Sequence, residues 1–355
     1  MTVAIKTMGK AEQSDYAAFV QCHPQALIYH TLEYKALLHR LLPEARAHYL
    51  LGFADGKLKA VLPAFILSTE AGTVINSLPF YGSHGGLLAA EESAEVVEAV
   101  VAAFEVLSSG EGVISATVIE PVFPTVPDNG ALFVHDLEDF RIGQVSSLPS
   151  GDAGEAIEAG ILAGMHQKAR NSLRRGLREN FVVSHGDSLE NISDLEQLHR
   201  ENMSAIGGQA KSSAFFSAVR ESFEYDTHYR IYMARAANGD VAASLMVLYF
   251  RDWVEYFVPA SHQDYRSKQP LSVLILRAMT DAALERQSTK WNWGGTWASQ
   301  DGVYRFKSRW GARDHRYRYF IRLPLGLDPL KAHGLEGLQR SFPFFFTCPY
   351  LSLGT

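Results

Sequence analysis

The sequence predicts an α/β protein built from two repeated units, and three observations support this class. The chain of 355 residues is long enough for two domains of ordinary size. Two predicted hairpins, at 48–67 and 229–250, carry their turn glycines Gly56 and Gly239 at matching positions. Each hairpin is accompanied by helical and strand patterns in a similar order. We expect each unit to be a mixed, twisted sheet flanked by helices.

The composition is that of an ordinary globular protein, with 47% hydrophobic and 20% charged residues. Cys22 and Cys348 lie far apart and form no CxxC pattern, so we expect neither a disulfide framework nor a metal site. The first residues lack the cationic start and apolar run of a signal peptide. No stretch approaches the roughly 18 apolar residues of a spanning helix. We therefore expect a cytoplasmic protein.

The first predicted domain covers 1–150. Its elements are helical periodicity between 11 and 42, a hairpin at 48–67 turning at Asp55-Gly56, a helix at 90–109, and strands at 112–121 and 131–137.

The second predicted domain covers 151–325 and is followed by a tail, 326–355, that we expect to pack on the body. Its elements are a basic helix at 156–179, a strand at 181–186, helices at 188–205 and 212–224, the second hairpin turning at Asn238-Gly239, a strand at 253–261, a helix at 270–287, and a short strand that begins at 290.

Positive charge is concentrated in two segments although the net charge is −6. The segment 166–180 holds five basic residues and one acidic residue, and the segment 305–318 holds six basic residues and one acidic residue. An acidic protein with two such segments is expected to contact phosphates. The alternative is a pair of surface helices stabilised by salt bridges.

The stretch 291–311 combines features of a binding site. A short strand ends at Gly294-Gly295, where the backbone is free to adopt unusual angles and a ligand can approach closely. A polar loop follows, and the segment Tyr304-Arg305-Phe306-Lys307 then presents cations beside aromatic rings. The alternative is a turn followed by an amphipathic helix with a solvated basic face.

The second half resembles a GCN5-related N-acetyltransferase (GNAT) unit, in which a hairpin and a third strand lead to a loop that binds the pyrophosphate of coenzyme A. The family's loop pattern is Arg/Gln-x-x-Gly-x-Gly/Ala. The corresponding segment here is RSKQPL, 266–271, which keeps Arg266, lacks both glycines, and contains Pro270 in place of an amide donor.

The chain as a whole resembles the FemABX family, whose members contain two such units in tandem. The resemblance spans roughly 1–325. It depends on the two hairpins, the loop PFYGSHGGLLA (79–89), the basic run KARNSLRRGLREN (168–180), and the pattern GG…GVYRFKSRWGA. It implies tandem GNAT-like domains and the transfer of an amino acid from aminoacyl-tRNA to the peptide of a peptidoglycan precursor.

The resemblance also implies roles for individual residues. The family's Phe-Lys pair falls on Phe306 and Lys307. The lysine would stabilise the oxyanion formed during acyl transfer, and the phenylalanine would keep the acyl pocket dry. The basic run would hold a diphosphate or a tRNA backbone through Lys168, Arg170 and Arg174. The other candidate substrate-binding residues are Tyr256, Arg266, Gly294, Gly295, Tyr304 and Arg305, although a strand tyrosine such as Tyr256 is also a common core residue.

The sequence leaves three functions open. The first is transfer of an aminoacyl or acyl group to an amine of a peptidoglycan or polysaccharide precursor, by direct attack and without a cofactor other than the donor. The acceptor would be a nucleotide- or lipid-diphosphate-linked glycan. The second is acyl-CoA-dependent N-acylation of an amino sugar or amino acid. The third is a non-catalytic module that binds diphosphate glycans or RNA.

We expect the aromatic tail to pack on the first domain; the alternative is contact with the inner face of the membrane.

Overall fold

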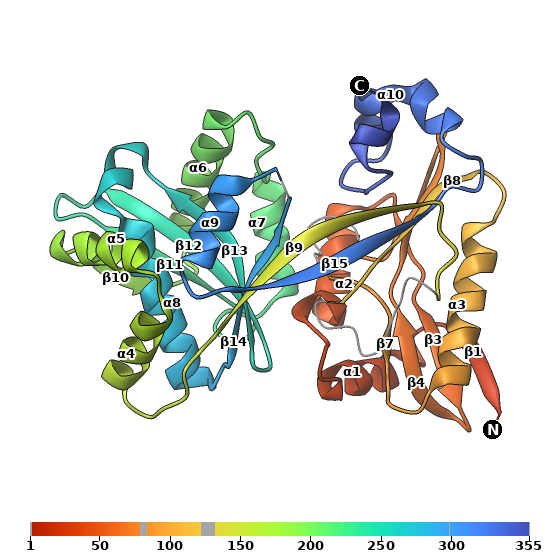
Figure 1. The fold of residues 1–355 in the computed structure, drawn as a ribbon, viewed down its shortest axis with the longest axis horizontal. Coiled ribbons are helices and arrows are strands. Elements are labelled where there is room, and N and C mark those ends of the chain that lie inside the picture. The colour runs from red at the N-terminus through yellow and green to blue at the C-terminus, as the bar shows by residue number, and fades with distance from the viewer. Residues whose placement is uncertain (1, 79–83, 122–131, 298, 355) are drawn as a thin grey trace. The chain divides into compact units, whose positions relative to one another are not determined.

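The structure is a computed structural model that describes residues 2–78, 84–121, 132–297 and 299–354 (Figure 1). The chain forms two compact units. Unit 1 comprises Met1–Arg141 and Arg316–Thr355, and unit 2 comprises Ile142–His315. The domain limits inferred from the sequence, 1–150, 151–325 and 326–355, stay a prediction.

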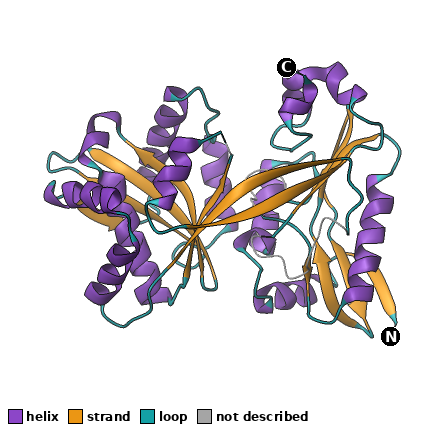
Figure 2. Ribbon diagram, in the orientation of Figure 1, coloured by secondary structure: helices purple, strands orange, loops and turns teal. Residues whose placement is uncertain are grey.

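Unit 1 contains two groups of strands with helices packed against them (Figure 2). One group is a four-stranded sheet in the order β1-β3-β4-β7, and the other has the order β15-β8-β6-β5-β2. Its elements are β1 (Val3–Thr7), α1 (Gln13–Cys22), η1 (Ile28–His30), α2 (Leu32–Leu41), β2 (Arg46–Ala47), β3 (Leu50–Ala54), β4 (Lys57–Leu62), β5 (Phe65–Thr69), β6 (Gly72–Asn76), β7 (Leu88–Ala89), α3 (Ala94–Ser108), β8 (Val113–Ile119), α10 (Asp328–Ser341) and η4 (Tyr350–Leu353).

Unit 2 contains strands in the order β10-β11-β12-β13-β14-β9. Its elements are α4 (Gly154–Gly164), α5 (Gln167–Arg178), β10 (Val182–His185), α6 (Leu189–Ala205), α7 (Ser213–Ser222), β11 (Tyr229–Arg235), β12 (Val241–Phe250), β13 (Trp253–Ser261), η3 (Gln263–Lys268), α8 (Pro270–Arg286), β14 (Lys290–Thr296) and α9 (Asp301–Ser308). Two strands pass from one unit to the other along the chain: β9 (Leu137–Ser147) and β15 (Arg313–Arg322).

The core of each unit forms around one apolar helix. In α3, Val96, Val100 and Phe104 recur at helical spacing and are buried against β3 and β1. In unit 2, α8 is buried over most of its circumference and packs against β12 and β11, with Leu274 and Ala278 fully buried. A helix buried in this way fixes its own N-terminus relative to the sheet, and that end borders the candidate site.

Both hairpins turn at the glycines that predicted them. Asp55 and Gly56 have φ of 47° and 78° between β3 and β4, as a two-residue turn requires. The second hairpin has a longer loop, in which the amide of Ala236 donates to the carbonyl of Asp240 and Gly239 has φ of 90°.

Two predicted elements are wrong. The helix predicted at 156–179 is two helices, because Met165 and His166 are extended and the amide of His166 donates instead to the carbonyl of Arg309. The strand predicted at 131–137 is not formed at 132–136, and Ala131 lies outside the described residues. The strand in this region is β9, which begins at Leu137.

The C-terminal segment is part of unit 1. Phe342, Phe345 and Cys348 are buried. The amide of Phe346 donates to the side chain of Asn76 at 2.6 Å, and Asn76 donates back to the carbonyl of Phe346 at 2.8 Å. These contacts order the tail through the backbone as well as through apolar burial.

Candidate active site

The candidate site begins where two parallel strands stop pairing. β13 and β14 pair at three positions, from Trp253 with Lys290 to Glu255 with Asn292. Beyond this point β13 continues to Ser261, whereas β14 pairs with β9 through Gly295 and Thr296 after a shift in register. The facing edges of the two strands are therefore not hydrogen-bonded to each other beyond Asn292, and backbone groups become accessible to a ligand.

Lys307 on α9 is directed at the end of β14. Its side chain is buried, and Nζ donates to Thr296 Oγ1 at 2.7 Å and to the carbonyls of Gly294 and Gly295 at 3.3 Å each. The two carbonyl contacts are long for hydrogen bonds. Either of these hydrogen bonds could therefore be replaced by one to a developing oxyanion at a small cost in free energy.

Gly294 can present its carbonyl in this way because it has φ of 73°, a conformation that most side chains disfavour. The predicted grouping of Lys307 with Gly294 and Gly295 is thus present in the structure.

The electrostatic environment of Lys307 makes its proton labile. Burial lowers the pKa of Lys307 to about 8. Thr296 Oγ1, which accepts from Lys307, lies 3.5 Å from Gln144 Oε1, and Gln144 Nε2 donates to Ser308 Oγ at 2.9 Å. An ammonium group with this pKa can stabilise an oxyanion and can also release a proton near neutral pH.

A buried polar network positions the end of β14, and sequence reasoning missed it. Asn292 is fully buried and donates to Glu255 Oε2 at 2.9 Å, while its Oδ1 accepts from the amide of Gly294 at 2.9 Å. The network holds the glycine whose carbonyl faces Lys307. A sequence signal was present, because Glu255 and Asn292 each stand between apolar and aromatic residues, in WVEYF and WNW.

Aromatic side chains form one wall of the site. The rings of Phe306 and Trp293 meet edge to face, with centroids 5.9 Å apart, and the Tyr256 ring lies 5.0 Å from that of Trp293. Tyr256 is half-buried and packs against the core cluster that contains Trp291 and Trp310. Burial raises its pKa, so the phenol stays protonated. This wall can exclude water from a bound acyl group.

A pocket of about 420 Å³ adjoins this wall. It is lined by Lys168, Ala169, Ser172, Gln269, Ser272, Phe306, Arg309 and Trp310. Two of these residues are cations, and none is acidic. α8 begins here at Pro270, and no side chain among the described residues caps its first turn. Cations together with the positive end of a helix dipole favour a bound phosphate.

The walls of the pocket are held together by close helix packing. A Cβ atom on Gly176 of α5 would lie 2.7 Å from the carbonyl oxygen of Gln269, immediately before α8. His166 caps α5 by accepting from the amide of Lys168 at 3.1 Å. The break between α4 and α5 thus places Lys168 at a helix start that borders the pocket.

Other predicted substrate-binding residues lie elsewhere or have structural partners. Arg170 donates to the carbonyls of Leu162 and Met165, at 3.1 and 2.9 Å, and so closes the end of α4. Arg174 donates to Asn171 at 3.3 Å, and Arg266 in η3 is exposed; neither lines the pocket. Their roles in binding stay predictions.

The remaining candidates lie on α9. Tyr304 donates to Asp314 Oδ2 at 2.7 Å, and this hydrogen bond raises its pKa. Arg305 is exposed and pairs with Asp301 one turn earlier at 2.9 Å. Only Phe306 and Lys307 of the segment 304–307 therefore face the wall and the end of β14.

No cluster of three or more His, Cys, Asp or Glu side chains is arranged to hold a metal ion within the ranges given above. Within the same ranges, no helix has both the length and the apolarity to cross a bilayer.

Comparison with known proteins identifies the class of this site. Residues 165–317 match the family described as Acetyltransferase (GNAT) domain. A search of curated protein sequences found no match. The matched range contains the pocket, the end of β14, and Lys307. The chain therefore carries a GNAT domain and is an acyltransferase.

Solved structures extend the likeness to nearly the whole chain. The structure of FemX aligns with a TM-score of 0.70 at 12% identity, over 91% of this chain and 98% of that one. A tandem GNAT protein from the clavulanic acid biosynthesis pathway aligns with a TM-score of 0.54 at 11% identity, over 91% and 99%. The L-PGS of Bacillus licheniformis aligns with a TM-score of 0.51 at 12% identity, over 88% and 96%.

These alignments show the fold. The chain shares its fold with FemX and with a tandem GNAT protein, which confirms both the predicted fold class and the predicted FemABX-type resemblance.

Proposed function

We propose that this acyltransferase moves an aminoacyl group to an amine of a cell-envelope precursor, a peptidoglycan or polysaccharide intermediate, by direct attack. The observation that carries the proposal is the buried Lys307 ammonium at the end of β14, which adjoins an aromatic wall and a cationic pocket. The pocket would hold the phosphate of the donor, and the wall would hold its acyl group. The tandem architecture shared with FemX supports an aminoacyl donor.

The proposed reaction needs no enzyme nucleophile. The acceptor amine attacks the carbonyl carbon of the donor ester, and a C–N bond forms. Negative charge develops on the carbonyl oxygen and is stabilised by Lys307. The intermediate then collapses, the C–O bond to the tRNA ribose breaks, and the ribose oxygen takes up a proton as the amine loses one. With a coenzyme A thioester, the C–S bond breaks instead and the thiol leaves.

Two donors are compatible with a phosphate-binding pocket, and the loop before α8 favours aminoacyl-tRNA. The glycines with which GNAT units surround a pyrophosphate are replaced here by Gln269 and Leu271, and Pro270 supplies no amide. Acyl-CoA-dependent transfer to an amino sugar or amino acid is the second candidate, and the GNAT match at 165–317 supports it.

The acceptor would be a nucleotide- or lipid-diphosphate-linked glycan. We accordingly propose a cytoplasmic protein, with peripheral contact at the inner membrane face when the acceptor is lipid-linked.

Neutralising the pocket should weaken donor binding. We expect Lys168→Gln and Arg309→Gln each to reduce the affinity for the donor by roughly tenfold, because each removes a charged hydrogen-bond donor to phosphate. The measurement is fluorescence anisotropy with an aminoacylated tRNA, in parallel with calorimetry using coenzyme A. The slope of log K against log salt should become shallower in each variant.

Arg305→Gln is the matched control, since Arg305 lies four residues before Arg309 but is exposed, is paired with Asp301, and does not line the pocket. Its donor affinity should match the wild type. Equal losses in all three variants would mean that net charge, rather than the pocket, holds the donor. Binding of coenzyme A with no binding of tRNA would reject the aminoacyl donor in favour of the second candidate.

A further inference from the structure

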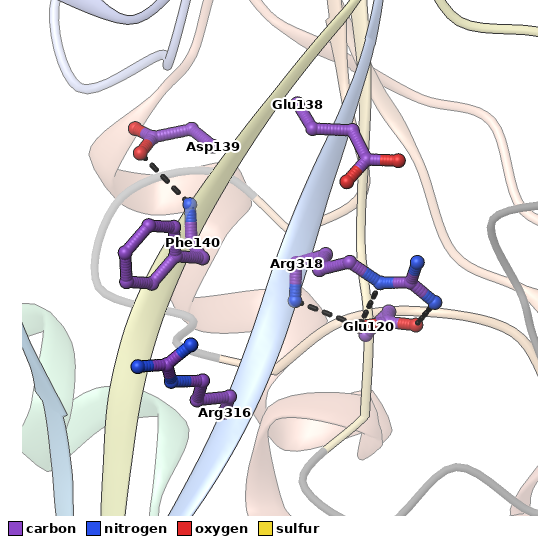
Figure 3. A pocket seen from close by; sticks show the side chains of 6 residues that line it. All are labelled: Glu120, Glu138, Asp139, Phe140, Arg316 and Arg318. Carbon is purple, nitrogen blue, oxygen red and sulfur yellow. Dashed lines mark hydrogen bonds and ion pairs between the residues drawn. The ribbon is translucent and has the colours of Figure 1, made fainter.

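A second pocket lies in unit 1, outside the candidate active site. Its volume is about 340 Å³, and it is lined by Glu120, Glu138, Asp139, Phe140, Arg316 and Arg318 (Figure 3). Glu138 and Phe140 come from β9, and Arg316 and Arg318 come from β15. In each strand the two residues are two positions apart and so belong to one face of the strand. Three carboxylates and two guanidinium groups give the lining a net charge of −1.

Two of the three carboxylates are neutralised by protein partners. Glu120 is buried and accepts from Arg318 three times: from the backbone amide at 2.7 Å, from Nε at 3.2 Å, and from NH2 at 3.0 Å. Asp139 accepts from NH1 of Arg141 at 2.7 Å and from the amide of Phe140 at 2.8 Å. These groups form a rigid part of the lining, because protein donors hold both carboxylates in place.

Arg316 is different. Its guanidinium lies 5.3 Å from the centre of the Phe140 ring. No hydrogen bond or ion pair of the Arg316 side chain is present among the residues that the structure describes. An aromatic ring contacts one side of the guanidinium and leaves the N–H groups at its edge available. These N–H groups can form a bidentate ion pair with a carboxylate.

Glu138 is the other lining charge with capacity left for a ligand. Its Oε1 lies 3.0 Å from Nε2 of His135, and the residue is exposed. No partner of Oε2 is present among the residues that the structure describes. This second carboxylate oxygen is therefore available to a cationic ligand.

The remaining charges are placed at separate ends of the pocket. In Figure 3, Arg316 lies beside Phe140 at one end, and Glu138 lies at the other. A ligand that satisfies both needs a carboxylate and an ammonium group with a chain between them. Bound phosphate is disfavoured because Glu138 lines the same pocket as Arg316 and would repel it. The volume admits a small molecule rather than a long peptide.

We propose that this pocket binds a free amino acid with an ammonium group at the end of its side chain, such as lysine. Arg316 holds the α-carboxylate, Phe140 contacts the methylene chain, and Glu138 holds the side-chain ammonium. The ligand's carboxylate and side-chain ammonium complement the two remaining charges of the lining, Arg316 and Glu138. The proposal does not depend on acyl transfer, because binding is measured directly and in the absence of a donor.

The test is equilibrium binding of L-lysine to the full chain, followed by calorimetry or ligand-observed NMR. We expect L-norleucine, which lacks the side-chain ammonium, and cadaverine, which lacks the carboxylate, each to bind at least tenfold more weakly. Arg316→Gln and Glu138→Gln should each weaken L-lysine binding at least tenfold. Arg313→Gln is the matched control, because Arg313 is an exposed arginine on the same strand outside the pocket.

Several results would overturn the proposal: no L-lysine binding at millimolar concentration, equal binding of norleucine or cadaverine, or unchanged binding in the Arg316 and Glu138 variants. Tighter binding of pyrophosphate than of L-lysine at this pocket would also overturn it. Circular dichroism confirms that each variant is folded before its binding is compared. Both side chains are exposed, so substitution with glutamine should preserve the fold.

Discussion

Replacing Lys307 with methionine is expected to lower the kcat of acyl transfer by about 100- to 1,000-fold while leaving donor affinity nearly unchanged. The ammonium is buried and directed at the end of β14, and it does not line the pocket at the start of α8. Its loss therefore removes stabilisation of the oxyanion rather than binding of the donor. The measurements are single-turnover rates and donor affinity for the same preparation.

The pH dependence of the acyl-transfer rate tests whether the charged form of Lys307 is the active one. Burial lowers the pKa of Lys307 to about 8, so the ammonium fraction falls about tenfold per pH unit above that value. The ratio of the wild-type rate to that of Lys307→Arg should fall in the same range, because arginine keeps its charge. Taking the ratio cancels the titration of the acceptor amine. A ratio that rises with pH would show that the neutral amine acts as a base.

The same ionisation has a consequence for stability. Unfolded lysine keeps its proton up to a pKa of about 10.4. Between about pH 8 and that value the unfolded state binds more protons than the folded state, so the free energy of unfolding increases with pH. Lys307→Met should lack this contribution in urea titrations. Lys290→Met is a suitable control, since Lys290 is partly exposed and paired with Asp252. The kcat of the Lys290→Met variant should be close to that of the wild type.

Replacing Asn292 with leucine is expected to lower the free energy of unfolding by about 3 kcal/mol. The substitution leaves a buried carboxylate oxygen of Glu255 and the amide of Gly294 without the partner they have now. We also expect kcat to fall by roughly tenfold, because the carbonyl of Gly294 would no longer be held toward Lys307. Urea denaturation and single-turnover rates test the two effects separately.

Asn171→Leu is the control for this substitution. Asn171 is exposed on α5, and its replacement should change the free energy of unfolding by no more than about 0.5 kcal/mol. An Asn292→Leu variant with wild-type stability would show that the network is not needed for folding. A stable variant with wild-type kcat would remove Asn292 from the positioning role assigned to it.

Local patterns predicted much of the fold. The Asp55-Gly56 hairpin, the strand at 253–261, and the helix that begins at Pro270 are all present, because each has a strong signal in its own residues. The break at His166 could not be predicted in the same way. It depends on a hydrogen bond to Arg309, which is distant in sequence.

In the candidate site, too, features with a local signal were predicted and features that depend on distant contacts were not. Phe306 and Lys307 were found through a family pattern, and the structure brings Lys307 to the glycine pair that the sequence had marked. The pocket at the start of α8 depends on three separate helices, so its limits could not be read from one segment. The partners of Arg170 and Arg305 were hidden for the same reason, since charge alone does not reveal whether a side chain closes a helix end or faces solvent.

The division of unit 1 into two chain segments has a consequence for biosynthesis. Unit 2 is one continuous segment, so it can be completed on the ribosome before the end of the chain emerges. Unit 1 must wait for Arg316–Thr355, because β8 pairs with β15 from Ile119–Tyr319 to Ala116–Arg322. Until then one edge of β8 has no partner strand from β15. An unpaired edge of this kind can pair with other chains, so the nascent protein passes through a stage in which it needs protection from aggregation.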